Sequence, residues 1–146
     1  GLRLFLPKSF AKLTYCGLGP VESYVDKHQA SYHGVFHSTP AEQQEDYIRP
    51  QENGSHFGCA RVTITDGAGA VTVTSPEDFS FNLSHYTQEE MTEKMHNYEL
   101  TESPDNVFCF DCKMSGVGSN SCGPRLAKAM QFDDETFTFK FDLTVE

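Results

Sequence analysis

The feature that most constrains the fold of this sequence is a run in which apolar and polar residues alternate one by one. Near the C-terminal end, apolar residues occupy every second position, with threonine, lysine or aspartate between them: Phe137, Phe139, Phe141, Leu143 and Val145. Successive side chains of a β-strand point to opposite faces, so this alternation is typical of a half-buried strand. The run predicts a strand with one apolar face and one polar face.

Other short apolar stretches indicate that β-structure dominates the chain. They predict further strands at residues 2–6, 11–16, 61–65, 70–74, 78–83 and 107–112. The sequence Asp-Gly-Ala-Gly at residues 66–69 lies between two of these strands and is typical of a hairpin turn. Many short strands with one or two helices favour a mainly-β fold, an antiparallel β-sandwich.

One helix is indicated by a capping box at residues 87–90. The Thr87 hydroxyl and the Glu90 carboxylate can each satisfy a free amide at a helix start. The helix is expected to run to about residue 96 or 97, with Met91, Met95 and Tyr98 on one face. A second, weaker helix is possible at residues 40–46, with Thr39 as its cap.

Length, charge and cysteine content narrow the class of protein. A chain of 146 residues fits one domain, residues 1–146. With 21 acidic and 11 basic residues the net charge is −10, so a nucleic-acid partner is not expected. No apolar run approaches the roughly 20 residues that span a bilayer, so no membrane partner is expected either. Five cysteines without a visible secretory leader favour reduced thiols and a cytoplasmic location.

The cysteine and histidine spacings do not predict a metal site. Cys109 and Cys112 form a C-x-x-C, but residues three apart on a strand point to opposite faces. Two buried or half-buried thiols are the better interpretation, because a zinc site needs a second pair of ligands. His33 and His37 are four residues apart, yet the sequence between them is typical of a strand or turn.

Two polar segments are candidate functional loops. Residues 49–54 (RPQENG) can form a structural corner with an Arg49–Glu52 ion pair, or the same two side chains can contact a ligand. Residues 115–124 (SGVGSNSCGP) are rich in glycine, and Ser119, Asn120 and Ser121 offer the hydroxyl and amide groups that recognise sugars. A tight polar loop between strands explains the second segment equally well.

Four segments, in order along the chain, resemble the C-terminal part of the β-galactosidases of glycoside hydrolase family 2. Residues 17–27 resemble the family's G-x-G-P-x-E-x-Y-x-D-[RK] segment, and residues 48–54 its P-x-E-N-G segment. Residues 81–87 (FNLSHYT) resemble the strand that leads into its helix. Residues 114–124 resemble its glycine- and serine-rich loop before a proline.

The resemblance implies a fold for this chain. The last domain of the family is a large antiparallel β-sandwich similar to galactose mutarotase, and it is longer than this chain. Residues 1–146 would therefore form its C-terminal half, a partial supersandwich. Strands that normally pair with the other half could be exposed or could pair with a second copy, so a homo-oligomer is possible.

The resemblance also implies a division of labour. Family members are retaining glycosidases whose two catalytic glutamates lie on a separate barrel domain, together with magnesium and sodium ligands. No segment here matches those motifs, so we expect no catalytic residue and no cofactor in this chain. This chain would contact galactosides only as part of the active site of the longer protein. The loop before the proline carries a tryptophan that lines the sugar site in well-known bacterial members, and Cys122 occupies that position here. The candidate substrate-binding residues are Ser119, Asn120, Ser121 and Cys122, followed by Arg49 and Glu52.

Three functions remain open. The first is a non-catalytic part of a β-galactosidase, an enzyme that hydrolyses terminal β-D-galactose residues, in which the chain supports and lines the sugar site. The second is a free-standing carbohydrate-binding module, whose aromatic platform would have to come from tyrosine or phenylalanine because tryptophan is absent. The third is mutarotase-like anomerisation of sugars by histidine and glutamate.

Overall fold

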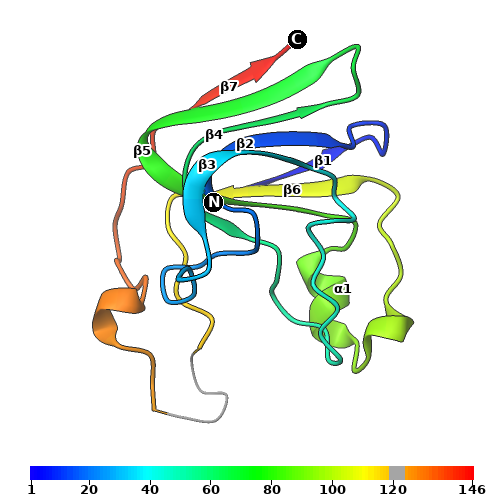
Figure 1. Ribbon diagram of the computed structural model, residues 1–146. Coiled ribbons are helices and arrows are strands. Elements are labelled where there is room, and N and C mark those ends of the chain that lie inside the picture. The colour runs from blue at the N-terminus through cyan, green and yellow to red at the C-terminus, as the bar shows by residue number, and fades with distance from the viewer. Residues whose placement is uncertain (119–123) are drawn as a thin grey trace.

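The computed structural model describes residues 1–118 and 124–146, and one antiparallel sheet dominates it (Figure 1). Its path runs β1-β6-β5-β4-β2-β3, and β7 pairs with β5 beside this path. The mainly-β prediction with one short helix is confirmed. The strands are β1 (Leu2–Leu6), β2 (Lys12–Gly19), β3 (Tyr32–Ser38), β4 (His56–Thr65), β5 (Ala70–Ser84), β6 (Asn106–Asp111) and β7 (Asp142–Val145).

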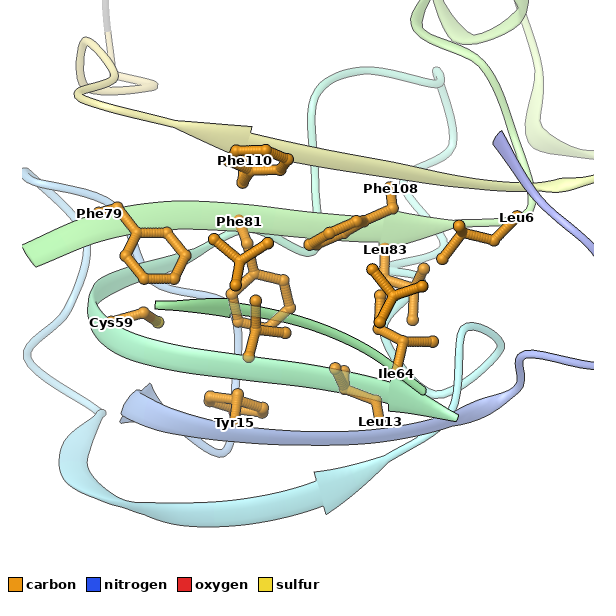
Figure 2. Close-up of a cluster of buried hydrophobic side chains, with 13 residues drawn as sticks. Leu6, Leu13, Tyr15, Cys59, Ile64, Phe79, Phe81, Leu83, Phe108 and Phe110 are labelled. Carbon is orange, nitrogen blue, oxygen red and sulfur yellow. The ribbon is translucent and has the colours of Figure 1, made fainter. Parts of the chain in front are cut away.

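The long strand β5 allows one sheet to enclose a core. Its first residues pair with β4 and β7, and its last residues pair with β6. The pairing of β4 with β5 is irregular on both sides of Cys59, and Gly58 has a φ of +66°, where a side chain is disfavoured. Such β-bulges bend a strand and increase its twist. The sheet therefore curves until side chains from its two ends meet, as the core residues in Figure 2 show.

The core comes from alternate positions of five strands. Figure 2 shows Tyr15 on β2 approaching Phe81 on β5, and their rings are 5.2 Å apart in an edge-on arrangement. Phe81 also meets Phe108 on β6 at 6.4 Å. Edge-to-face pairs of this kind add to the stability that burial provides. The buried cluster contains Leu6, Leu13, Tyr15, Cys59, Val62, Ile64, Val71, Val73, Phe79, Phe81, Leu83, Phe108 and Phe110.

The predicted helix forms but ends earlier than expected. Helix α1 covers Gln88–Glu93, and the Thr87 hydroxyl accepts the Glu90 amide at 3.1 Å. The helix stops because the Glu99 carboxylate accepts the amides of Met95 and His96, both at 3.0 Å, and begins a 3₁₀ turn, η1 (Asn97–Glu99). Met91 is therefore buried, whereas Met95 and Tyr98 are exposed, and the prediction of a shared face is wrong.

Two other local expectations differ from the structure. Residues 40–46 do not form a helix: residues 40–43 form a turn in which the Thr39 hydroxyl accepts the Glu42 amide, and residues 44–46 have no regular structure. The C-terminal strand is confined to β7, because its partner β5 continues into Ser75 and Pro76. Proline has no amide to donate to a ladder, and the Ser75 hydroxyl instead donates to the Lys140 carbonyl. Among the described residues, no helix is both long enough and apolar enough to cross a membrane.

We predict that truncation of the core aromatic residue Phe81 strongly destabilises the fold. Phe81 is fully buried, so F81A should lower the free energy of unfolding by about 3–5 kcal/mol through lost burial and an unfilled cavity. Urea denaturation followed by circular dichroism measures the change. The matched control is F5A, at a side chain that is 51% exposed, which should cost less than about 1 kcal/mol. Equal losses for the two variants would contradict the core described here.

Candidate functional site

The buried carboxylate of Glu22 joins the end of β2 to the corner at residues 49–54. Glu22 is only 6% exposed, and its Oε2 accepts the Gly54 amide at 2.7 Å. Its Oε1 accepts the Tyr47 hydroxyl at 2.5 Å and also contacts Lys27 Nζ. Although burial opposes ionisation, these hydrogen bonds lower the pKa of Glu22. Gly54 has a φ of +70°, and a Cβ there would lie 2.2 Å from the Gln43 carbonyl oxygen, so the corner requires glycine.

Glu52 lies beside this network in a less favourable environment. The Tyr24 hydroxyl donates to Glu52 Oε1 across a long distance of 3.4 Å. Burial, with smaller contributions from the charges of Asp111 and Glu22, raises the pKa of Glu52 to about 7. The two neighbouring glutamates therefore have pKa values shifted in opposite directions, downward for Glu22 and upward for Glu52.

Asp26 holds the start of the glycine-rich loop. Its Oδ1 accepts the Val117 amide at 3.0 Å, and its Oδ2 accepts the Gly118 amide at 2.9 Å. A Cβ on Gly116 would lie 2.3 Å from Asp26 Cγ, so only glycine allows the backbone to approach the carboxylate this closely. Reciprocal backbone hydrogen bonds between Tyr24 and Lys27, of 2.8 and 3.0 Å, form the turn that carries Asp26. One side chain thus positions the backbone just before residue 119.

Glu52 and Met114 separate two hollows. The loop hollow has a volume of about 360 Å³ and is lined by Gln51, Glu52, Met114, Ser115, Gly116 and Val117. The sheet cavity has a volume of about 310 Å³ and is lined by Gly1, Leu2, Arg3, Glu52, Asn82, Gln88, Cys109, Asp111 and Met114. Among the residues that the structure describes, only Glu52 and Met114 line both. A change in the charge of Glu52 therefore alters the electrostatic potential in both the loop hollow and the sheet cavity.

The structure places the predicted site residues in different ways. Glu52 does lie beside the glycine-rich loop, because both line the loop hollow. Arg49 is exposed, and within the described part of the chain it forms no ion pair with Glu52, so the proposed internal bridge is absent. The remaining candidates, Ser119, Asn120, Ser121 and Cys122, lie outside the described residues.

Sequence reasoning did not select the residues that organise the site. Glu22, Tyr24, Asp26 and Lys27 all belong to the segment at residues 17–27 that resembles the family pattern, so that segment was the available signal. Its spacing alone does not reveal that Asp26 reaches a loop 91 residues away.

The cysteines and histidines that the structure describes do not form a cluster of metal ligands. Cys16, Cys59, Cys109 and Cys112 are free thiols, and Cys109 and Cys112 are half-buried as predicted. Within residues 1–118 and 124–146, no three histidine, cysteine, aspartate or glutamate side chains gather in a way that could hold a metal ion. Burial lowers the pKa of His56 to about 4, so this core histidine is neutral at physiological pH.

Comparison with known proteins defines the class of protein. The family model described as β-galactosidase small chain matches residues 1–143. The chain therefore belongs to the β-galactosidase small-chain family. It is 48% identical over 143 residues to a β-galactosidase of Actinobacillus pleuropneumoniae and 43% identical to one of Staphylococcus xylosus, each time over 98% of this chain. A β-galactosidase of Kluyveromyces lactis is 30% identical over the whole chain. The chain spans only 14% of the length of each of these relatives, so it corresponds to one domain of a much larger protein.

We predict that Glu52 and Glu22 affect stability with opposite pH dependence. The folded-state pKa of Glu52 lies above its ordinary value of 4.5, so ionisation costs folded-state stability as the pH rises through about 7. Between about pH 4 and pH 8.5, the stability of E52Q relative to the wild type should therefore improve by up to about 3 kcal/mol. Chemical denaturation across this pH range measures the difference.

Glu22 provides the contrast. Because its folded-state pKa is lowered, Glu22 stabilises the fold at neutral pH, and this contribution disappears as the pH falls below the ordinary value of 4.5. E22Q should be less stable than the wild type at pH 7, with the gap narrowing in acid. The assignment of the two environments is wrong if both variants follow the same pH trend.

Proposed function

We propose that this chain is the domain of a β-galactosidase that lines the sugar site and supports its rim, while a separate barrel domain of the longer protein carries out the chemistry. The observation that carries the proposal is the contact between Asp26 and the amides of Val117 and Gly118. These residues immediately precede the candidate sugar-binding residues 119–122. The family relationship supplies the enzyme class.

The described part of the site is suited to positioning and recognition. Glu52 presents carboxylate oxygens to the loop hollow, and sugar hydroxyls are donors that such acceptors recognise. The backbone at Val117 and Gly118 is held by two hydrogen bonds to Asp26. Fixing a loop before binding reduces the entropy that binding must overcome. In this proposal the catalytic glutamates, and the magnesium and sodium ions, belong to the barrel.

We predict that Asp26 controls substrate affinity in the complete β-galactosidase chain that carries this domain. D26N retains the shape of the side chain but turns an amide NH₂ toward a backbone amide, so one of the two loop hydrogen bonds is lost. KM for an aryl galactoside should rise about tenfold, which corresponds to about 1.4 kcal/mol, with a smaller change in kcat. Steady-state kinetics provide the measurement.

The control is E77Q, which removes the same charge from an exposed residue that lines neither hollow. It should leave KM unchanged. A wild-type KM for D26N, in an enzyme whose melting temperature is also unchanged, would show that the loop does not take part in substrate binding.

We predict that the isolated chain hydrolyses no galactoside. The assay is release of nitrophenol from an aryl galactoside by highly purified protein, and any turnover that copurifies with the chain contradicts the proposed division of labour. An NMR titration with galactose and lactose, which follows the amides at residues 49–54 and 115–122, tests the site separately. Saturable shifts would favour an independent carbohydrate-binding module, whereas the proposal expects the site to be complete only beside the barrel.

A further inference from the structure

The sheet cavity lies on the face of the sheet opposite the aromatic core. Arg3, Cys109 and Asn82 are register partners across β1, β6 and β5, so their side chains stand in a row on one face. Phe108 and Phe110, the neighbours of Cys109 in sequence, point into the core. Helix α1 contributes Gln88 to the cavity, and the corner at residues 49–54 contributes Glu52. Five separate segments thus converge on a polar space.

Three hydrogen-bond acceptors in this cavity are poorly satisfied. Asn82 is 5% exposed, and its Nδ2 donates to the Asn53 carbonyl, which fixes the orientation of the amide. Its Oδ1 is buried and has no partner within the described residues, which is costly for a polar atom. From residues 1–118 and 124–146, Glu52 accepts a hydrogen bond only from the distant Tyr24 hydroxyl. Asp111 is half-buried and pairs with the ammonium group of Gly1 at 3.5 Å.

Arg3 and Gln88 line the cavity, and each donates hydrogen bonds to other groups of the protein. Arg3 Nη1 donates to Gln88 Oε1 at 2.9 Å and to Glu89 Oε2 at 2.7 Å. Gln88 Nε2 donates to Cys109 Sγ at 3.2 Å. Glu89 does not line the cavity, so the charge of Arg3 is balanced from outside it. The cavity therefore has unmet acceptors and two carboxylates, and it needs a ligand that brings donors and positive charge.

We infer that the sheet cavity binds a guanidinium group. Guanidinium is planar and positively charged, and it carries five N–H donors and no acceptor. In this chain the Gly1 ammonium contacts Asp111 and would compete with a bound cation. In any longer chain in which a residue precedes Gly1, that ammonium becomes a neutral amide and Asp111 loses this partner. The guanidinium can belong to an arginine of the remainder of the protein or to a free small molecule. This site shares Glu52 and Met114 with the loop hollow of the proposed galactoside site, and its other lining residues are different.

An NMR titration of the isotope-labelled chain with methylguanidinium tests the inference. The amides of Glu52, Asn82 and Asp111 should shift in a saturable way at concentrations below those that unfold the protein. N-methylurea is the matched control, because it has nearly the same shape and no charge, and it should cause no saturable shifts. Absence of shifts with methylguanidinium, or equal shifts with both compounds, overturns the inference.

Variants separate a local site from general attraction to an acidic protein. D111N keeps the size of the side chain and should weaken methylguanidinium binding about fivefold or more. The control E77Q removes the same charge from an exposed position and should leave binding unchanged. Acetylation of the Gly1 amine removes the competing cation and should tighten binding. Equal weakening by D111N and E77Q, or no effect of acetylation, contradicts a site at Asp111.

The same titration on the complete β-galactosidase chain distinguishes the two sources of the guanidinium. Binding that persists there identifies a free cation as the occupant. Loss of binding, together with a lower melting temperature for D111N, identifies a side chain from the rest of the protein. Loss of binding with no effect of D111N on the melting temperature overturns the inference. None of these readouts depends on galactoside hydrolysis, so failure here leaves the proposed function unaffected.

Discussion

The candidate site depends on one buried carboxylate, that of Glu22. Removing a charged group from water is expensive unless other groups replace its hydrogen bonds. Here Tyr47, Lys27 and the Gly54 amide replace them, and each comes from a different part of the chain. Because the carboxylate is most stable when all three are in place, it draws the end of β2 and the corner at residues 49–54 together. The position of Glu52 between the two hollows follows from this arrangement.

The curvature of the sheet provides the second requirement, a rigid support. The irregular pairing around Cys59 bends β4 and β5 so that a single sheet encloses its own aromatic core. The polar face of β6, with Cys109 and Asp111, is then turned away from that core. Polar groups can gather on this face without weakening hydrophobic packing. The architecture thus keeps the apolar core and the polar cavity on opposite sides of the same strands.

Local sequence patterns revealed the β-strands well but revealed the site only in part. Alternation identified most strands because a strand that is buried on one face has apolar residues at every second position, such as Val71 and Val73 on β5. The alternation predicted too long a last strand, because the residue that ends the pairing, Pro76, lies on the partner strand β5 and not in the alternating run itself. Strand β3 has little apolar alternation, since most of its side chains are exposed or half-buried. Thr87 was recognised as a cap because the hydrogen bond it makes is local.

Apart from the contacts within residues 22–27, the contacts that define the site are long-range, and no local pattern contains them. The Glu90 carboxylate was expected to return to Thr87, but it accepts the distant Thr101 amide at 2.8 Å. The resemblance of residues 17–27 to a known family pointed to the correct segment. The partners of Glu22 and Asp26 emerged only from the folded chain.

The hydrogen bonds between Asp26 and the glycine-rich loop also bear on the order of folding. They join residues that are 91 and 92 positions apart, whereas the hairpin of β4 and β5 closes across a few residues. Closing a long loop costs more chain entropy than closing a short one, and that cost must be met before the contact adds stability. Formation of the hairpin is therefore expected to precede capture of the loop. Protection of the Val117 amide from hydrogen exchange would then report that the chain has completed its fold.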